Sequence, residues 1–333
     1  MENIPVIIDV DTGIDDAYAL IIAVASGRLD VKAVTTVAGN VTLSHTTENT
    51  CNMLHLLGVT DVPVSPGASA PLSRELLTAP EVHGADGLRG YRFDGSHDEL
   101  ISPVPAVERM AQILKESDRP VTILALGPAT NVAQLLLRYP GLKGNIERIL
   151  FMGTSYRCGN PTIVSTFNVL VDPEAFEVLL DSGVPLYALP LDTSNRGAYL
   201  TKEECLLIRD IPGEVARLAY DTLCGYGDRV GQKGGCFAET QADEKDWQQA
   251  GHAHLPDPAV VAFLLHPEWF TVKKYYCQVE CEGKLTTGFT IIDMDDYYGK
   301  TEAERNLWYI DSMQREPFVR LFLDSLRHFA GKQ

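Results

Sequence analysis

Residues 6–26, VIIDVDTGIDDAYALIIAVAS, decide the fold, because an apolar run passes there through an acidic turn into a helical stretch. Residues 6–10 are typical of a buried strand, since β-branched residues dominate them. Residues 15–26 predict a helix that ends at Gly27. A short strand followed at once by a helix is the repeating unit of α/β folds, so this stretch predicts that class.

The same alternation continues through the first two thirds of the chain. Further apolar strands are predicted at residues 31–37, 121–126, 146–152 and 184–191. Helices are predicted between them at residues 44–57, 129–138 and 173–181. Because the strands are continuously apolar, they suit a parallel sheet that is covered on both faces. The sequence therefore predicts a doubly wound α/β fold, with a mostly parallel sheet flanked by helices.

The last third of the chain has a different pattern. Helices are predicted at residues 213–226, 258–265 and 317–329. Residues 271–281 and 284–293 predict a small antiparallel hairpin near the C-terminus. Residues 228–254 are polar and glycine-rich, which predicts a mobile loop beside a site. No linker-like segment or repeat divides the chain, so we expect one domain over residues 1–333.

The composition excludes several classes of function. The chain has 45 Asp and Glu against 28 Lys and Arg, a formal net charge of −17, which disfavours nucleic acid as a partner because phosphate binding needs a basic surface. No apolar run reaches the length of about 18 residues that a membrane span needs. The first residues lack a signal-peptide pattern, and the seven cysteines form no Cys-x-x-Cys pair. We therefore expect a cytoplasmic protein with reduced thiols and no membrane partner.

Polar residues gather directly after the predicted strands. Because ligands bind beyond the carboxyl ends of the strands in an open parallel sheet, we expect these residues to converge. They are Asp9, Asp11, Asp15 and Asp16 after the first strand, Asn40 after the second, and Asn131, Asn160 and Asn168 after later ones. A helix N-terminus tolerates one or two carboxylates, but a crowded set repels itself unless a cation neutralises it. The pattern favours a hard ion such as Ca²⁺ or Mg²⁺.

Familiar acidic motifs fit this stretch poorly. An EF-hand loop requires Asp or Asn where Gly13 stands and Glu where Leu20 stands. A phosphatase of the Asp-x-Asp type, with Asp9 and Asp11, requires Thr or Val at the fifth position, which is again Gly13. The phosphatase alternative predicts that phosphate is released from phosphomonoesters with Mg²⁺.

Residues 8–17, IDVDTGIDDA, resemble the N-terminal signature of the inosine–uridine-preferring nucleoside hydrolase family. Blocks similar to that family follow in family order, so the resemblance covers essentially residues 4–330. They lie at residues 35–40, 82–84, 127–131, 152–153, 167–168, 172–175, 257–258 and 283–288. The resemblance implies Ca²⁺-dependent hydrolysis of the N-glycosidic bond of ribonucleosides, which yields ribose and a free purine or pyrimidine base. It also implies a homodimer or homotetramer.

The resemblance also implies roles for individual residues. Asp11, Asp16 and Asp257 would hold Ca²⁺ together with the backbone carbonyl of Leu126. Asp11 would also be the general base that takes a proton from water. The positions that match ribose-binding ones are Asp15, Asn40, Asn160 and Asn168. His83 matches a position at the base end of the pocket.

Two positions depart from the family pattern. Many members have a His where Pro256 stands, and that His helps to protonate the leaving base. His252 and His254 lie just upstream and either substitute for it or are solvated loop residues. Thr166 stands where the family has a Glu that contacts the 5′-hydroxyl of the sugar.

Three questions stay open at this stage. The base preference is not predicted; Tyr226, Arg229 and Trp247 are candidates for contacting the base, or surface and packing residues. The group that protonates the leaving base is not identified. The alternative to an active hydrolase is a nucleoside- or ribose-binding homologue that kept the metal site and has weak or altered hydrolase activity.

Overall fold

The structure is a computed structural model that describes residues 3–225 and 252–331, and it confirms the predicted α/β class. An 8-stranded sheet has the order β3-β2-β1-β4-β5-β6-β12-β9. Every neighbouring pair in it is parallel except β12 with β9. The strands are β1 (Ile4–Val10), β2 (Leu29–Thr36), β3 (Val64–Pro66), β4 (Val121–Ala125), β5 (Ile146–Met152), β6 (Leu186–Leu189), β9 (Phe270–Tyr275) and β12 (Leu307–Met313).

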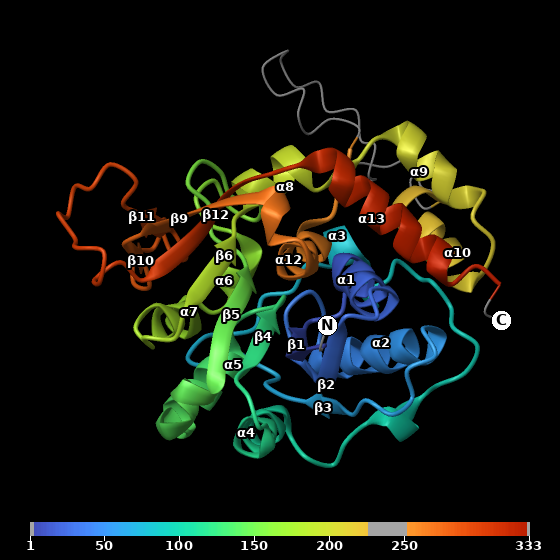
Figure 1. Ribbon diagram of the computed structural model, residues 1–333, viewed down its shortest axis with the longest axis horizontal. Helices are drawn as coiled ribbons and strands as arrows, with labels where there is room; N and C mark the ends of the chain where they lie inside the picture. Colours follow the sequence, from blue (N-terminus) through green and yellow to red (C-terminus); the bar gives the residue numbers. More distant parts are fainter. Residues whose placement is uncertain (1–2, 226–251, 332–333) are drawn as a thin grey trace.

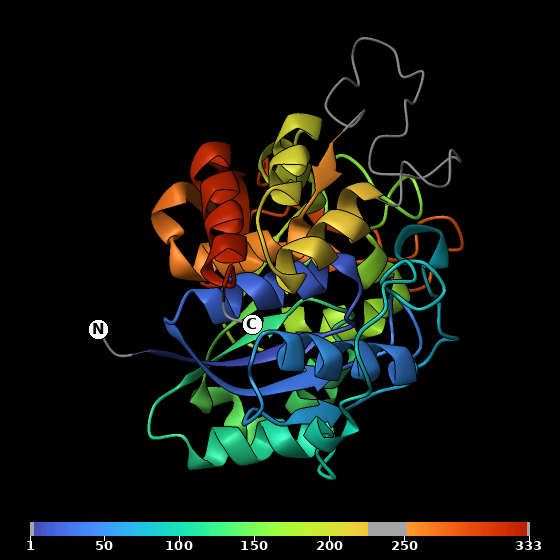
Figure 2. The same cartoon turned by 90° about the vertical axis from the view of Figure 1, so that its right-hand side faces the viewer.

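Helices cover both faces of this sheet, as Figure 1 shows, and the view turned by 90° shows the sheet between the two layers (Figure 2). One face carries α1 (Ile14–Ala25), α2 (Leu43–Leu56), α12 (Pro256–Leu265) and α13 (Arg315–His328). The other carries α4 (Ala106–Glu116), α5 (Thr130–Arg138) and α7 (Pro173–Leu180). Alternate residues of β1 enter opposite cores, since Ile8 packs in the first and Ile7 in the second. This is why β1 is apolar along its whole length.

The remaining elements are short. The helices are α3 (Pro80–His83), α6 (Phe167–Val171), α8 (Leu191–Gly197), α9 (Lys202–Arg209) and α10 (Glu214–Tyr220). The strands are β7 (Tyr199–Leu200), β8 (Ala253–His254), β10 (Cys277–Val279) and β11 (Thr290–Ile292). The 3₁₀ helices are η1 (Asp98–Leu100), η2 (Pro140–Asn145) and η4 (Pro267–Trp269), and η3 (Asp221–Gly225) is a π-helical turn. Within residues 3–225 and 252–331, no helix combines the length and apolarity that crossing a membrane requires.

The predicted antiparallel hairpin near the C-terminus is present, but it is shorter than predicted. Within the predicted hairpin segments, the antiparallel pair is formed by β10 with β11. The preceding strand, β9, instead joins the edge of the main sheet beside β12, a strand that we did not predict. Pairing with a distant strand leaves no local signal, because it depends on where the chain returns in space. Likewise, the helix predicted at residues 213–226 is α10 followed by the π-helical turn η3, and residue 226 lies outside the described residues.

The strand order places a topological switch point between β1 and β4. From β1 the chain moves outward to β2 and β3, whereas β4, β5 and β6 extend in the other direction. The connections after β1 and β4 therefore diverge and leave a crevice at the carboxyl ends of these strands. The backbone N–H of Leu126 donates a hydrogen bond to the carbonyl of Asp9 (2.8 Å), which joins the two strand ends. Ligands are expected in this crevice.

Candidate active site

A cavity of about 130 Å³ lies at the switch point. It brings together predicted site residues that follow several different strands. Those that line it are Asp11, Asp15, Asn40, His83, Leu126, Asn160, Thr166, Asn168 and Asp257. Asp16 is fully buried next to this wall rather than on it. The convergence that the strand pattern predicted is therefore present, whereas the chemical role of each residue stays a prediction.

Asp16 is held by the backbone of the turn that precedes α1. Its Oδ2 atom accepts hydrogen bonds from the N–H of Gly13 (2.9 Å) and from the side-chain amide of Asn40 (3.1 Å). Its Oδ1 atom accepts one from the N–H of Asp11 (3.2 Å). Asp16 thus caps the helix N-terminus, where the dipole favours negative charge. Stabilisation of the helix N-terminus therefore accounts for the burial of Asp16, but it does not account for the neighbouring carboxylates.

Asp11 is gripped so closely that its neighbours have to be glycine. The N–H of Asn40 donates to Asp11 Oδ2 (2.8 Å). A Cβ atom on Gly39 would collide with that same oxygen, and one on Gly127 would lie 2.7 Å from Asp11 Oδ1. The glycines after β2 and β4 therefore let two backbone segments approach one carboxylate. This approach fixes the direction of Asp11 before any ligand binds.

Asp9 does not line the cavity. Its Oδ1 atom accepts hydrogen bonds from Thr35 Oγ1 (2.5 Å) and from the side-chain amide of Asn131 (2.8 Å). Asn131 in turn donates to the carbonyl of Thr36 (3.0 Å). Asp9 and Asn131 thus join β1, β2 and α5 behind the site. Of the carboxylates predicted to crowd together after the first strand, Asp9 therefore has a structural role, and the others lie in or beside the cavity.

The cavity carboxylates are crowded and uncompensated. One oxygen each from Asp15, Asp16 and Asp257 lies within 4.8 Å of the others. Burial raises the pKa of Asp15 and of Asp16 to about 6, and the neighbouring charges add to this for Asp16. Burial and the surrounding carboxylates raise the pKa values of Asp11 and Asp257 well above the usual range.

The donor set fits a hard divalent cation. Asp15 Oδ1 is buried without a hydrogen-bond partner among the described residues, and no Lys or Arg is found among the described side chains that line the cavity. Buried carboxylates without a counter-charge are costly, so the arrangement calls for positive charge. Carboxylate and backbone carbonyl oxygens are the ligands that Ca²⁺ takes. The carboxylates and the Leu126 carbonyl therefore suit such an ion.

His83 faces the cavity as a neutral hydrogen-bond donor. Its Nδ1 atom accepts a hydrogen bond from the N–H of Ile14 (3.2 Å), so the ring proton sits on Nε2. Burial lowers the pKa of His83 to about 4. A Cβ atom on Gly13 would collide with the ring, so Gly13 makes this contact possible. His83 is thus suited to donating a hydrogen bond and not to carrying a positive charge at neutral pH.

Amide and hydroxyl groups form the opposite wall. The Asn168 amide donates to the carbonyls of Leu126 (2.5 Å) and Met152 (3.1 Å), which ties α6 to the ends of β4 and β5. Asn160 Oδ1 accepts a hydrogen bond from the N–H of Phe167 (2.9 Å). Thr166 Oγ1 accepts a hydrogen bond from the N–H of Thr154 (3.1 Å), so one acceptor position of this hydroxyl is already occupied within the protein.

Asp192, which we did not predict, anchors this wall. Its carboxylate accepts hydrogen bonds from the N–H groups of Tyr156 (2.6 Å) and Arg157 (3.2 Å), from Ser155 Oγ (3.0 Å) and from the Tyr309 hydroxyl (3.1 Å). These contacts hold the start of the segment that leads from β5 to α6 and carries Asn160 to the cavity. The sequence offered one signal, an acidic residue shortly after the end of β6, the strand next to β5.

The two histidines considered as proton donors do not reach the cavity lining. His252 stacks on Tyr199, with ring centroids 4.3 Å apart, and His254 pairs with Tyr199 in the small β7–β8 sheet. Burial lowers the pKa of His254 to about 4, so the ring stays neutral. Pro256 itself lines the cavity. The other candidates, Tyr226, Arg229 and Trp247, lie outside the described residues.

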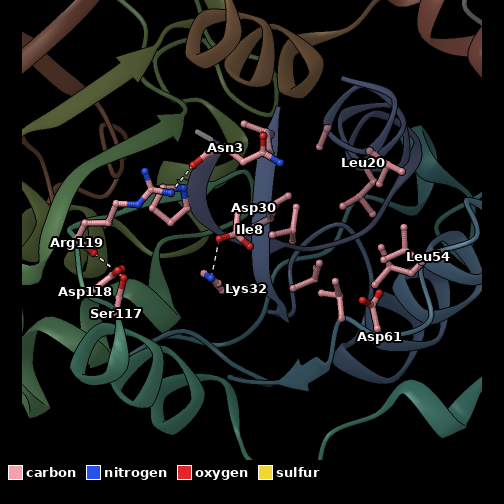
Figure 3. A pocket seen from close by; sticks show the side chains of 18 residues that line it. Asn3, Ile8, Leu20, Asp30, Lys32, Leu54, Asp61, Ser117, Asp118 and Arg119 are labelled. Atoms are coloured by element: carbon pink, nitrogen blue, oxygen red, sulfur yellow. Dashed lines mark hydrogen bonds and ion pairs between the residues drawn. The ribbon is translucent and has the colours of Figure 1, made fainter. Parts of the chain in front are cut away.

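A larger cavity, about 760 Å³, lies at the opposite, amino end of the strands (Figure 3). Its inner wall is apolar and includes Ile8 and Leu20. Two of the charges at its rim are already matched, since Lys32 pairs with Asp30 (2.6 Å) and Arg119 donates to the carbonyl of Asn3 (2.5 Å). The predicted site residues line the smaller cavity and not this one, so the smaller cavity is the better candidate for chemistry.

Comparison with known proteins agrees with this site. Residues 6–320 match the family model described as inosine-uridine preferring nucleoside hydrolase. The chain is 40% identical over 329 residues to a pyrimidine-specific ribonucleoside hydrolase, RihA, of Shigella flexneri serotype 5b (strain 8401), which covers 98% of this chain and 99% of that protein.

Two solved structures are similar in fold. One is a purine-preferring ribonucleoside hydrolase from Gardnerella vaginalis, with a TM-score of 0.85 and 24% identity, covering 99% of this chain and 100% of that one. The other is a plant nucleoside hydrolase, PpNRh1, with a TM-score of 0.84 and 26% identity, covering 97% and 98%. The family model and the 40% identical relative both span nearly the whole chain. The chain therefore belongs to the inosine-uridine preferring nucleoside hydrolase family, whose members are hydrolases that act on N-glycosyl bonds.

Proposed function

We propose that this protein hydrolyses ribonucleosides to ribose and a free base with the help of one Ca²⁺ ion. The residues proposed to hold the ion are Asp11, Asp16 and Asp257, together with the carbonyl oxygen of Leu126. The observation that carries this proposal is the group of buried carboxylates at the switch point, with no basic side chain among the described lining residues. When bound, Ca²⁺ supplies the positive charge that stabilises these carboxylates and makes an adjacent water more acidic.

Asp11 is the proposed general base. Its carboxylate is fixed by the N–H of Asn40 and by two glycine segments, so it points in one direction. It accepts a proton from the water that attacks the anomeric carbon, while the bond from that carbon to the base nitrogen breaks and the base leaves with the bonding electrons. Because the water attacks from the face opposite the base, the configuration at that carbon is inverted. The surrounding carboxylate and amide oxygens stabilise the positive charge that develops on the ribose.

The remaining lining residues are proposed to hold the nucleoside. Asp15 and Asn40 lie on the side of the cavity where α1 begins, and Asn160 and Asn168 form the opposite wall, so the ribose hydroxyls can be bound from both sides. His83 donates from Nε2 to an acceptor on the base, because its Nδ1 is occupied by Ile14. Thr166 offers no charge to the 5′ end of the sugar.

We propose pyrimidine ribonucleosides as the preferred substrates. The 40% identical relative is named as pyrimidine-specific and matches this chain over nearly its whole length. The purine-preferring enzyme of known structure shares only 24% identity, which supports the fold and no more. The direct experiment compares uridine, cytidine, inosine, adenosine and guanosine and measures reducing sugar with and without a Ca²⁺ chelator. We expect release from uridine and cytidine that the chelator abolishes.

Replacing the proposed base tests the mechanism. The Asp11→Asn variant should lose activity by about 10²- to 10⁴-fold, because it removes both the proton acceptor and a ligand charge. Asp30→Asn is a matched control, since Asp30 forms an ion pair with Lys32 away from the cavity. A steady-state kcat in Asp11→Asn equal to that of the control would refute the assigned role.

The alternative is a ribose- or nucleoside-binding homologue with little catalysis. It is favoured by Pro256 at the cavity wall and by the hydrogen bond that occupies Thr166. Isothermal calorimetry that detects Ca²⁺-dependent ribose binding, in a preparation that hydrolyses none of the five nucleosides, would select this alternative. The cytoplasmic location, the single domain over residues 1–333 and the homodimer or homotetramer are further proposals. Size-exclusion chromatography with light scattering tests the last of them.

A further inference from the structure

We propose that His55, His97 and Glu99 form a second metal site, for a zinc-class transition-metal ion, that is separate from the acidic cavity. His55 lies in the last turn of α2, and the other two residues lie in the segment around η1. All three are outside the cavity lining described above. The site is independent of the proposed nucleoside hydrolysis.

The three side chains present suitable atoms at suitable distances. One ligand atom from each lies within 4.8 Å of the other two. His97 Nδ1 lies 3.3 Å from Glu99 Oε1, and the rings of His55 and His97 have centroids 3.4 Å apart. A tetrahedral ion with bonds of about 2.0–2.1 Å separates its ligands by about 3.3 Å, which matches the distance between His97 Nδ1 and Glu99 Oε1.

Binding requires one local adjustment. The two imidazole rings are stacked almost in parallel, at an interplanar angle of 7°. Because a metal lies in the plane of each ring that binds it, the rings have to tilt apart about their side-chain torsions. His55 is exposed and His97 is half-buried, so there is space for this tilt. The ion then takes the place of the proton that His97 and Glu99 share.

The ligand chemistry separates this site from the acidic cavity. Two imidazoles with one carboxylate suit Zn²⁺, Cu²⁺ or Ni²⁺, whereas Ca²⁺ takes oxygen ligands. Cys51, one turn before His55, is buried, and its sulfur is not among the ligand atoms that group together here. The fourth position is left for water.

A titration of the full-length protein with Zn²⁺, in saturating Ca²⁺, tests this site. We expect one equivalent of Zn²⁺ to bind to the wild type. His55→Ala and His97→Ala should each weaken binding by at least about tenfold, because loss of even an outer-shell partner typically costs about 10- to 100-fold. His45→Ala is the matched control, since His45 lies on the same helix and contacts Thr42 instead. Substitution by Cu²⁺ should show coupling to two nitrogens in electron paramagnetic resonance.

Several outcomes would overturn the proposal. They are the absence of Zn²⁺ binding in the wild type, and unchanged binding in both histidine variants. A loss of Zn²⁺ binding in Asp257→Asn, with none in the histidine variants, would place the ion in the acidic cavity instead. Nucleoside hydrolysis should be the same in His55→Ala as in the wild type. Zn²⁺ binding therefore tests this site, and nucleoside hydrolysis tests the proposed function independently of it.

Discussion

Glycine residues around Asp11 show how single positions shape the cavity. Gly39 and Gly127 follow different strands, and a Cβ atom on either would press on the Asp11 carboxylate. Gly13 has the same relation to His83. None of these three has a positive φ angle, so glycine is required for space and not for backbone conformation. The glycines therefore let the backbone pack directly against the acid and the imidazole.

The Gly39→Ala variant tests this requirement. The added Cβ collides with Asp11 Oδ2, so the carboxylate has to move. We expect kcat to fall by about 100-fold, because a displacement of about 1 Å at a reacting group has that order of effect. The control is Gly141→Ala, where an added Cβ meets nothing within 4 Å. Wild-type kcat in a folded Gly39→Ala protein would contradict the proposed contact.

The segment between β5 and α6 acts as a wall that other elements hold in place. Asp192, at the start of α8, accepts hydrogen bonds from two backbone N–H groups of this segment, those of Tyr156 and Arg157. Thr290 of β11 exchanges hydrogen bonds with the backbone of Ser155. The wall is therefore positioned by α8 and β11, far away in the sequence from the acidic turn.

Asp192→Ala should loosen this wall without touching Asp11. We expect KM to rise by about tenfold, equivalent to about 1.4 kcal/mol, with a smaller change in kcat. Asp192→Asn keeps one acceptor oxygen and should recover part of the affinity. Asp210→Ala, at an exposed helix end, is the control. A fall in kcat alone, with KM unchanged, would mean that Asp192 acts on the chemical step instead.

The acidic cavity couples the stability of the whole molecule to pH and to Ca²⁺. Burial raises the pKa of Asp9 to about 7 and those of Asp15 and Asp16 to about 6, above the reference value of 3.8. The folded state therefore holds these protons more tightly than the unfolded chain. This tighter proton binding stabilises the folded state below about pH 4, and the stabilisation is lost as the pH rises through about 6 to 7.

Thermal unfolding of the Ca²⁺-free protein should show this loss. We expect Tm to fall between about pH 5 and about pH 8. Added Ca²⁺ should restore Tm mainly at the higher pH, where the carboxylates are ionised. At a Ca²⁺ concentration of 100 times Kd, binding adds about 2.7 kcal/mol to the free energy of unfolding. Asp257→Asn should reduce this rescue. A Tm at about pH 8 that Ca²⁺ does not change would contradict the proposed ion site.

The strand–helix alternation and the position of the acidic turn follow from local patterns along the chain. Strand β5 has the predicted bounds, because its apolar residues and the glycine that follows them are a local signal. The pairing of β9 with β12, the withdrawal of Asp9 from the cavity and the anchoring role of Asp192 were decided only by the tertiary structure. Burial and periodicity depend on residues that are close together in the sequence, so local patterns predict them. Partners in space depend instead on how distant segments return to one sheet edge.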